Sequence, residues 1–296
     1  MRVFRQVLVL PGTKLTEATI TALREISDEH PYMLQETELL STHWDKFRNV
    51  DIIVASWQDK IDEQILQFVP RLQFIALRAT TTYNVDMSLV RQRGIKVATI
   101  SNYGDIGTAE FVIEQIFQCF RHERTAKQQL PEEIFGRTIA LVGLGAVGSH
   151  VAIRASALGM HVRYFSPSGP KHNASTTYQY HPIEQLFKTA DVISFHSPAF
   201  VKALADEQFN LIARSTLLIV TTLGLPFSLK AFREWQTARN GTSVFDLCAA
   251  KGAIGYLQTL HGVKVIEAFA ARTPQSVQRA EHQLLQNCRN YLSGSL

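Results

Sequence analysis

The sequence predicts an α/β protein of two domains, each built around a parallel sheet, with the second domain inserted into the first. Over the first hundred residues, short runs rich in valine and isoleucine alternate with segments of helical periodicity, which is the pattern of βαβ units. A second series of this kind begins near Thr138. The length of 296 residues is also near the upper limit for one hydrophobic core, roughly 250–300 residues.

The outer domain is expected to comprise residues 1–103 together with residues 268–296. Its strands are predicted at 6–10, 51–57, 72–77 and 96–100, and its helices at 17–27 and 61–67. A final helix begins near Thr273 and repeats apolar residues at helical spacing. We expect this helix to return to the first domain and to cover its sheet.

The inserted domain is expected to span residues 104–267. It opens with an amphipathic helix predicted at 106–127. Its strands are predicted at 138–142, 162–165, 192–195, 217–221, 243–245 and 263–266.

Three glycines follow the first strand of the inserted domain with the spacing G-x-G-x-x-G, and a helical pattern continues after them. In this context Gly143 permits a tight turn, Gly145 admits a pyrophosphate, and Gly148 lets helix and strand pack closely. The helix, which begins at Ala146 and Val147, offers free N–H groups to phosphates. The expected cofactor is NAD or NADP, and both domains are expected to be Rossmann-like or flavodoxin-like. The alternative is a glycine-rich turn without a ligand.

The end of the second strand of such a domain usually carries an acidic residue for the adenosine ribose. This sequence has Ser166 there, with Ser168, Lys171 and His172 close by. A carboxylate would repel a 2′-phosphate, whereas hydroxyl and basic groups accept one. The segment therefore favours NADP over NAD, and the alternative is a solvated polar loop.

Several short motifs occur in a shared order along the chain. They are LQFIALR at 72–78, YNVD at 83–86, RGIKV at 93–97, TAEF at 108–111 and DVISFHSP at 191–198. In this order the sequence resembles the D-isomer-specific 2-hydroxyacid dehydrogenases over nearly its whole length. The resemblance implies a split outer domain, a small-molecule substrate or ligand, and a homodimer. It also places His196, Thr221 and Thr222 beside the cofactor.

The same resemblance implies three catalytic positions. In the family an arginine holds the substrate carboxylate, a histidine moves the hydroxyl proton, and a glutamate orients the histidine. Here Leu223 stands at the arginine position, Asp246 at the glutamate position and Ala268 at the histidine position, while Ser243 replaces an aspartate expected near the nicotinamide. Loss of a positioned acid or base costs roughly 10²–10⁴-fold in rate. The usual reaction is therefore predicted to be slow to negligible.

Two functions are compatible with these residues. The first is an NAD(P)-dependent oxidoreductase with a degenerate catalytic triad, acting on an atypical 2-oxo, 2-hydroxy or carbonyl substrate. Asp246 and Arg78 are its candidate catalytic residues, and the alternative for Arg78 is an arginine at the end of a strand that is paired at the surface. The second is a catalytically silent nucleotide-binding sensor or regulatory protein.

Composition excludes several other classes. The net charge of +4 is dispersed, which argues against a nucleic-acid partner, and no apolar run reaches the length of a membrane helix. Three widely spaced cysteines and scattered histidines predict neither a disulfide framework nor a metal site. A cytoplasmic location is the expectation.

Overall fold

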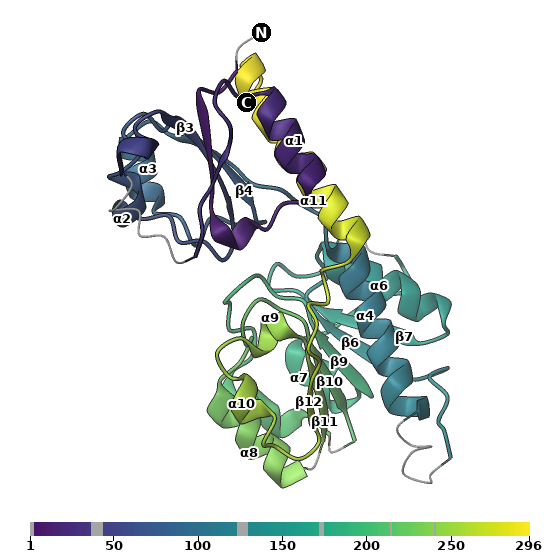
Figure 1. Cartoon of the computed structure of the whole chain (residues 1–296). Coiled ribbons are helices and arrows are strands. Elements are labelled where there is room, and N and C mark those ends of the chain that lie inside the picture. Colours follow the sequence, from purple (N-terminus) through teal and green to yellow (C-terminus); the bar gives the residue numbers. More distant parts are fainter. Residues whose placement is uncertain (1–2, 37–43, 123–129, 172–174, 214, 240) are drawn as a thin grey trace. The chain divides into compact units, whose positions relative to one another are not determined.

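The computed structural model describes residues 3–36, 44–122, 130–171, 175–213, 215–239 and 241–296 (Figure 1). The chain divides into two compact units. Unit 1 comprises Met1–Tyr103 and Pro274–Leu296, and unit 2 comprises Gly104–Thr273. Both units contain a sheet of parallel strands, which confirms the predicted α/β fold class.

The sheet of unit 1 has five strands: β1 (Gln6–Val9), β2 (Tyr32–Met33), β3 (Val50–Ser56), β4 (Phe74–Arg78) and β5 (Lys96–Ala98). They lie in the order β2-β1-β3-β4-β5, and every paired strand is parallel. This is the flavodoxin-like order. Sequence periodicity had indicated four of these strands within two residues; β2 is additional, and its two half-buried residues are too few to show a period.

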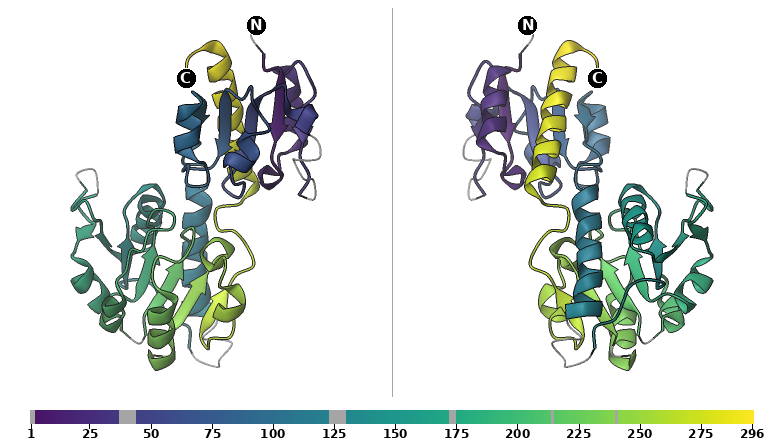
Figure 2. Two further views of the ribbon diagram at one scale, coloured as in Figure 1. Left: turned by 90° about the vertical axis from the view of Figure 1, so that its left-hand side faces the viewer. Right: turned by 90° about the vertical axis from the view of Figure 1, so that its right-hand side faces the viewer.

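Helices cover both faces of this sheet. On one face lie α1 (Glu17–Glu25) and α11 (Pro274–Ser293), whose Leu23 and Leu284 share a hydrophobic cluster with the strands (Figure 2). On the other face lie α2 (Glu63–Leu66) and α3 (Met87–Gln92). The predicted return of the last helix to the first domain is therefore confirmed.

The sheet of unit 2 has seven strands: β6 (Thr138–Val142), β7 (His161–Phe165), β8 (Gln179–Tyr180), β9 (Val192–Phe195), β10 (Leu217–Val220), β11 (Thr242–Phe245) and β12 (Val263–Val265). Their order is β12-β11-β10-β9-β6-β7-β8, and all pairs are parallel. Counted from β6, the first six strands follow the order 3-2-1-4-5-6 of the Rossmann fold. The order reverses between β6 and β9.

Two layers of helices enclose the sheet of unit 2. On one face lie α4 (Asp105–Phe117) and α6 (Ala146–Ala157). On the other face lie α7 (Ile183–Lys188), α8 (Leu229–Arg239), α9 (Leu247–Ala250) and α10 (Ile254–Leu257). Short 3₁₀ segments lie at Pro11–Thr13, Trp44–Phe47 and Asp206–Leu211.

The first helix of unit 2 differs from its predicted span of 106–127. Its α-helical part ends at Phe117 and a π-helical turn follows at Gln118–His122, while residues 123–127 lie outside the described part of the chain. Among the described helices, none has the length and hydropathy needed to cross a membrane.

Candidate functional site

The candidate site lies in unit 2 at the carboxyl ends of its strands. In open α/β sheets, ligands bind outside the carboxyl ends of the strands at the point where the strand order reverses. That point falls between β6 and β9. Gly143 follows β6 directly and His196 follows β9 directly, so the glycine motif and the histidine meet there.

The three glycines of the motif have different surroundings. Gly143 has a φ of +108°, and a Cβ built on it would lie 2.6 Å from the carbonyl oxygen of His196. A Cβ on Gly148 would clash with the carbonyl oxygen of Gly143. In contrast, a Cβ on Gly145 would have no described atom within 4 Å. The first and third glycines are thus required by packing, while the second leaves an open space above the turn.

The amino terminus of α6 opens onto this space. Its N-cap residue is Gly145, and no side chain caps the helix. The first intrahelical bond joins the N–H of Ser149 to the carbonyl oxygen of Gly145 at 2.9 Å. The N–H groups of Ala146 and Val147, in the first turn, have no intrahelical acceptor, and the helix dipole favours a negative charge beside them. This end of the helix is suited to a phosphate.

Four buried polar atoms on β9, just after β9 and just after β10 have no hydrogen-bond partner among the described residues. They are Ser194 Oγ, His196 Nε2, Ser197 Oγ and Thr221 Oγ1. Buried polar groups normally find partners because leaving them unpaired costs free energy. Burial also lowers the pKa of His196 to about 4, so the imidazole is neutral at pH 7 and offers one donor and one acceptor. Open space, free N–H groups and orphaned polar atoms together fit a dinucleotide.

The segment after β7 carries hydroxyl and ammonium groups. Ser166 is buried, and its Oγ lies 3.0 Å from Ser168 Oγ. The Lys171 Nζ donates to Ser168 Oγ at 3.0 Å. The N–H of Gly143 bonds to the carbonyl oxygen of Phe165 at 2.9 Å, so this segment starts beside the glycine turn. The structure therefore groups Ser166, Ser168 and Lys171, while His172 lies outside the described residues.

Hydrogen bonds join the loops that follow β10, β11 and β12. The N–H of Gly224 donates to the carbonyl oxygen of Cys248 at 3.2 Å, and that of Leu247 donates to the carbonyl oxygen of Ala268 at 3.1 Å. These contacts bring the predicted positions Leu223, Asp246 and Ala268 into one region. Thr222 also lies here, and its hydroxyl donates to the carbonyl oxygen of Gly224 at 2.8 Å.

Asp246 holds this region together. Its side chain is 1% exposed, and its two carboxylate oxygens accept the N–H groups of Ala249 at 2.9 Å and Ala270 at 3.0 Å. Burial raises the pKa of Asp246 to about 6 despite these bonds. Ser243 makes no such link, because its buried hydroxyl donates to Gln236 Oε1 at 2.9 Å within the core.

Phe200 is a site residue that the sequence did not reveal. Its φ is +57°, a conformation that non-glycine residues rarely adopt. Its N–H bonds to the carbonyl oxygen of Leu223 at 2.9 Å, and its ring lies where a Cβ on Gly224 would be. The side chain is nevertheless 53% exposed, and that of Val201 is 47% exposed. An apolar surface therefore adjoins Leu223, and no pattern of residues signals the unusual φ.

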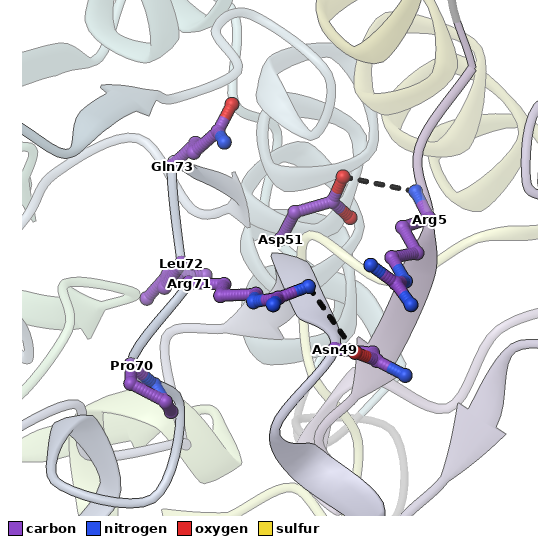
Figure 3. Close-up of a pocket in the computed structure, with 7 residues that line it drawn as sticks. All are labelled: Arg5, Asn49, Asp51, Pro70, Arg71, Leu72 and Gln73. Carbon is purple, nitrogen blue, oxygen red and sulfur yellow. Dashed lines mark hydrogen bonds between the residues drawn. The ribbon is translucent and has the colours of Figure 1, made fainter.

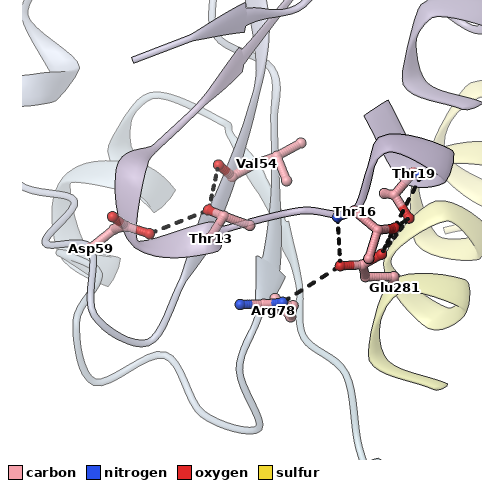
Figure 4. A network of polar contacts seen from close by, with 7 residues as sticks. All are labelled: Thr13, Thr16, Thr19, Val54, Asp59, Arg78 and Glu281. Atoms are coloured by element: carbon pink, nitrogen blue, oxygen red, sulfur yellow. Dashed lines mark hydrogen bonds and ion pairs between the residues drawn. The ribbon is translucent and has the colours of Figure 1, made fainter. Parts of the chain in front are cut away.

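Arg78 lies in unit 1, at the end of β4, in a polar network of its own (Figure 4). Its Nη1 is 3.7 Å from Oε1 of the buried Glu281 on α11. Glu281 also accepts the backbone N–H of Thr16 at 3.1 Å and the hydroxyl of Thr19 at 2.6 Å. Arg78 is thus paired with a carboxylate of its own unit. Its catalytic role and that of Asp246 stay predictions.

The described residues contain no group of three or more His, Cys, Asp or Glu side chains that could hold a metal ion.

The chain is similar to known proteins in its sequence and in its fold. The profile of the D-isomer specific 2-hydroxyacid dehydrogenase NAD-binding domain matches residues 110–224. The glyoxylate reductase of Korarchaeum cryptofilum is 26% identical over 225 residues, which are 68% of this chain and 68% of that protein. The D-lactate dehydrogenase of Aquifex aeolicus, solved with NAD and lactic acid, has a TM-score of 0.80 and 19% identity, and the match covers 98% of this chain and 96% of that one. An acyclic imino acid reductase solved with NADPH and D-Arg has a TM-score of 0.81 and 20% identity, with 98% of each chain covered.

Proposed function

We propose that this chain, an NAD-binding oxidoreductase of the D-isomer-specific 2-hydroxyacid dehydrogenase type, uses NADP to reduce or oxidise an atypical carbonyl or hydroxy substrate. The substrate is a 2-oxo, 2-hydroxy or simple carbonyl compound that is held without the family's arginine and histidine. The bound nicotinamide supplies or accepts a hydride, and this chain's residues bind and orient the reactants.

One observation carries the cofactor half of this proposal. The space above Gly145 is open, whereas the positions above Gly143 and Gly148 are closed by backbone. The open position lies between two closed ones at the amino terminus of α6, so it leaves room for a phosphate beside the turn. The uncapped amino terminus of α6 adds N–H donors beside that space. We assign Gly143, Gly145, Ala146, Val147 and Gly148 to the pyrophosphate.

The segment after β7 supports NADP over NAD. Ser166 and Ser168 offer hydroxyl groups, and the ammonium of Lys171 lies 3.0 Å from Ser168 Oγ. A 2′-phosphate would gain charge-assisted hydrogen bonds from these groups. The structural relative solved with NADPH is a precedent for NADP in this fold.

The substrate half rests on the loops after β10, β11 and β12. With Leu223 and Ala268 at the family's arginine and histidine positions, neither a guanidinium fork nor an imidazole is supplied there. The exposed ring of Phe200 adds apolar surface beside Leu223. A neutral or bulkier carbonyl compound suits this edge better than a small 2-oxo acid such as the glyoxylate of the curated relative. Asp246 would fix the two loops, while His196, Thr221 and Thr222 would meet the cofactor.

Turnover distinguishes an enzyme from a silent sensor. Purified protein is assayed with NADPH and NADH against glyoxylate, pyruvate, phenylpyruvate, phenylacetone and benzaldehyde. The proposal predicts oxidation of NADPH with a neutral or aromatic carbonyl compound and little with glyoxylate. Tight NADPH binding with no turnover on any compound would instead favour a catalytically silent nucleotide-binding protein. The absence of the family's arginine and histidine also supports that alternative.

The family further supports a homodimer, and we include a cytoplasmic homodimer in the proposal. Sedimentation velocity tests the dimer directly, because a species of twice the chain mass of 33.3 kDa is expected. A single species at the monomer mass at micromolar concentration would contradict it.

A further inference from the structure

A polar pocket lies in unit 1 at the amino ends of β1, β3 and β4 (Figure 3). Its volume is about 550 Å³, which is within the range of small-molecule sites. Its walls are formed by Arg5, Asn49, Asp51, Pro70, Arg71, Leu72 and Gln73. Ligands of open α/β sheets usually bind at the carboxyl ends of the strands. This pocket lies at the amino ends of the strands, so it is not the usual ligand site of such a sheet.

Two guanidinium groups extend into the space of this pocket from opposite walls, one from Arg5 and one from Arg71 (Figure 3). The Arg71 Nη1 donates to Asn49 Oδ1 at 3.5 Å, which is a long hydrogen bond. The Arg5 guanidinium makes no hydrogen bond or ion pair with any residue that the structure describes. Both side chains therefore keep donors available to an incoming group.

The carboxylate of Asp51 lies in the same pocket but is engaged by backbone. Its Oδ2 accepts the N–H of Arg5 at 2.9 Å, and its Oδ1 accepts the N–H of Gln6 at 3.3 Å. Two positive charges thus face one negative charge in this pocket. Like charges that share a pocket repel one another, and an anion between them removes that repulsion.

The neutral wall residues are held in place by their own bonds. The Asn49 Nδ2 donates to Glu29 Oε1 at 3.3 Å, and the Tyr291 hydroxyl of α11 donates to Gln73 Oε1 at 3.2 Å. The side chains of Asn49 and Gln73 are therefore already positioned, and only the exposed arginine side chains need to adjust to a ligand. Pre-organisation of this kind lowers the cost of binding.

We propose that this pocket binds a doubly charged oxyanion of the phosphate monoester class. Planar guanidinium groups match phosphate oxygens with paired hydrogen bonds, and the two of them outweigh the single negative charge of Asp51. The pocket is larger than a phosphate group alone, and Asn49 and Gln73 place amide groups beside the remaining space. A small polar organic group on the ester would occupy it. This site is independent of the proposed oxidoreductase function.

Calorimetric titration of the full chain with glycerol 3-phosphate tests this site. Saturable binding is expected in the wild type, and Arg5→Gln or Arg71→Gln should each raise the dissociation constant at least tenfold. The matched control is Arg91→Gln on α3, an exposed arginine of the same unit outside the pocket, which should leave the constant unchanged. All titrations are made at constant ionic strength, with and without saturating NADPH.

Three outcomes overturn the proposal. The first is no saturable binding by the wild type at millimolar glycerol 3-phosphate. The second is an equal loss of affinity in Arg91→Gln, which would indicate net charge alone. The third is displacement by NADPH, which would assign the binding to the glycine turn of unit 2. Failure of NADPH to bind would sink the proposed function without affecting this test.

Discussion

The substitution Gly145→Val separates ligand binding from folding at the glycine turn. Gly145 has a φ of −83° and a ψ of −158°, which any residue can adopt, and a Cβ there would meet no described atom within 4 Å. Replacing glycine at a compatible position removes freedom from the unfolded chain and stabilises the fold by about 0.4–1 kcal/mol. Because valine is a poorer N-cap residue than glycine, this gain is offset, and the melting temperature of Gly145→Val should stay close to that of the wild type.

Its effect on the cofactor should be large. The valine side chain would fill the space assigned to the pyrophosphate and move a phosphate away from the N–H groups of Ala146 and Val147. A hydrogen bond to a charged group contributes about 1.5–3 kcal/mol. Loss of one such bond raises the dissociation constant by roughly 10–150-fold.

The assay is calorimetric titration with NADPH at fixed salt, together with thermal unfolding of each variant. The matched control is Gly255→Val in α10, another glycine of unit 2 with no described atom within 4 Å of its added Cβ. The control should keep wild-type affinity. A folded Gly145→Val protein that binds NADPH as tightly as the wild type would refute the assignment of this space to the pyrophosphate.

Three further substitutions test other parts of the site. Ser166→Asp should raise the dissociation constant of NADPH roughly tenfold or more, because the carboxylate repels the 2′-phosphate. The dissociation constant of NADH should not rise. An unchanged dissociation constant of NADPH, measured by calorimetry, would contradict the proposed preference for NADP. Burial raises the pKa of Asp246 from 3.8 to about 6, so between these pH values the unfolded chain loses this proton before the folded chain and stability falls as the pH rises. The free-energy advantage of wild type over Asp246→Asn should therefore shrink by up to about 3 kcal/mol between pH 4 and pH 7 in denaturant melts, and a constant difference would be against it. Phe200→Gly suits the φ of +57° and should keep or raise the melting temperature, yet it should raise KM for phenylacetone several-fold more than for pyruvate; equal changes in both KM values would show that the ring does not contact the substrate.

Much of the fold followed from periodicity and glycine spacing. Strands such as β6 and β9 are continuous apolar runs buried on both faces, and such runs are visible in a sequence. The two-residue strands β2 and β8 were not predicted, because so short an edge strand has no period to detect. The glycine motif was informative because packing requires a glycine at Gly143 and Gly148, while Gly145 leaves open space beside the turn.

The rest of the site depends on contacts between distant segments. The pairing of Arg78 with Glu281 joins β4 to the last helix, and nothing local marks either residue as a partner of the other. Asp246 resembles an active-site acid in the sequence, yet its carboxylate is bonded to two backbone N–H groups in the structure. Phe200, whose φ is +57°, is hydrogen-bonded to Leu223 in the loop that follows β10, and this contact is not visible in its own segment of the sequence.

Direct titration of the purified wild-type chain with NADPH, and separately with NADH, tests the central claim that unit 2 binds a nicotinamide dinucleotide at the open turn above Gly145. We predict saturable binding of both nucleotides at one site per chain, with the smaller dissociation constant for NADPH. No heat of binding from either nucleotide at millimolar concentration, from protein that melts cooperatively, would contradict it.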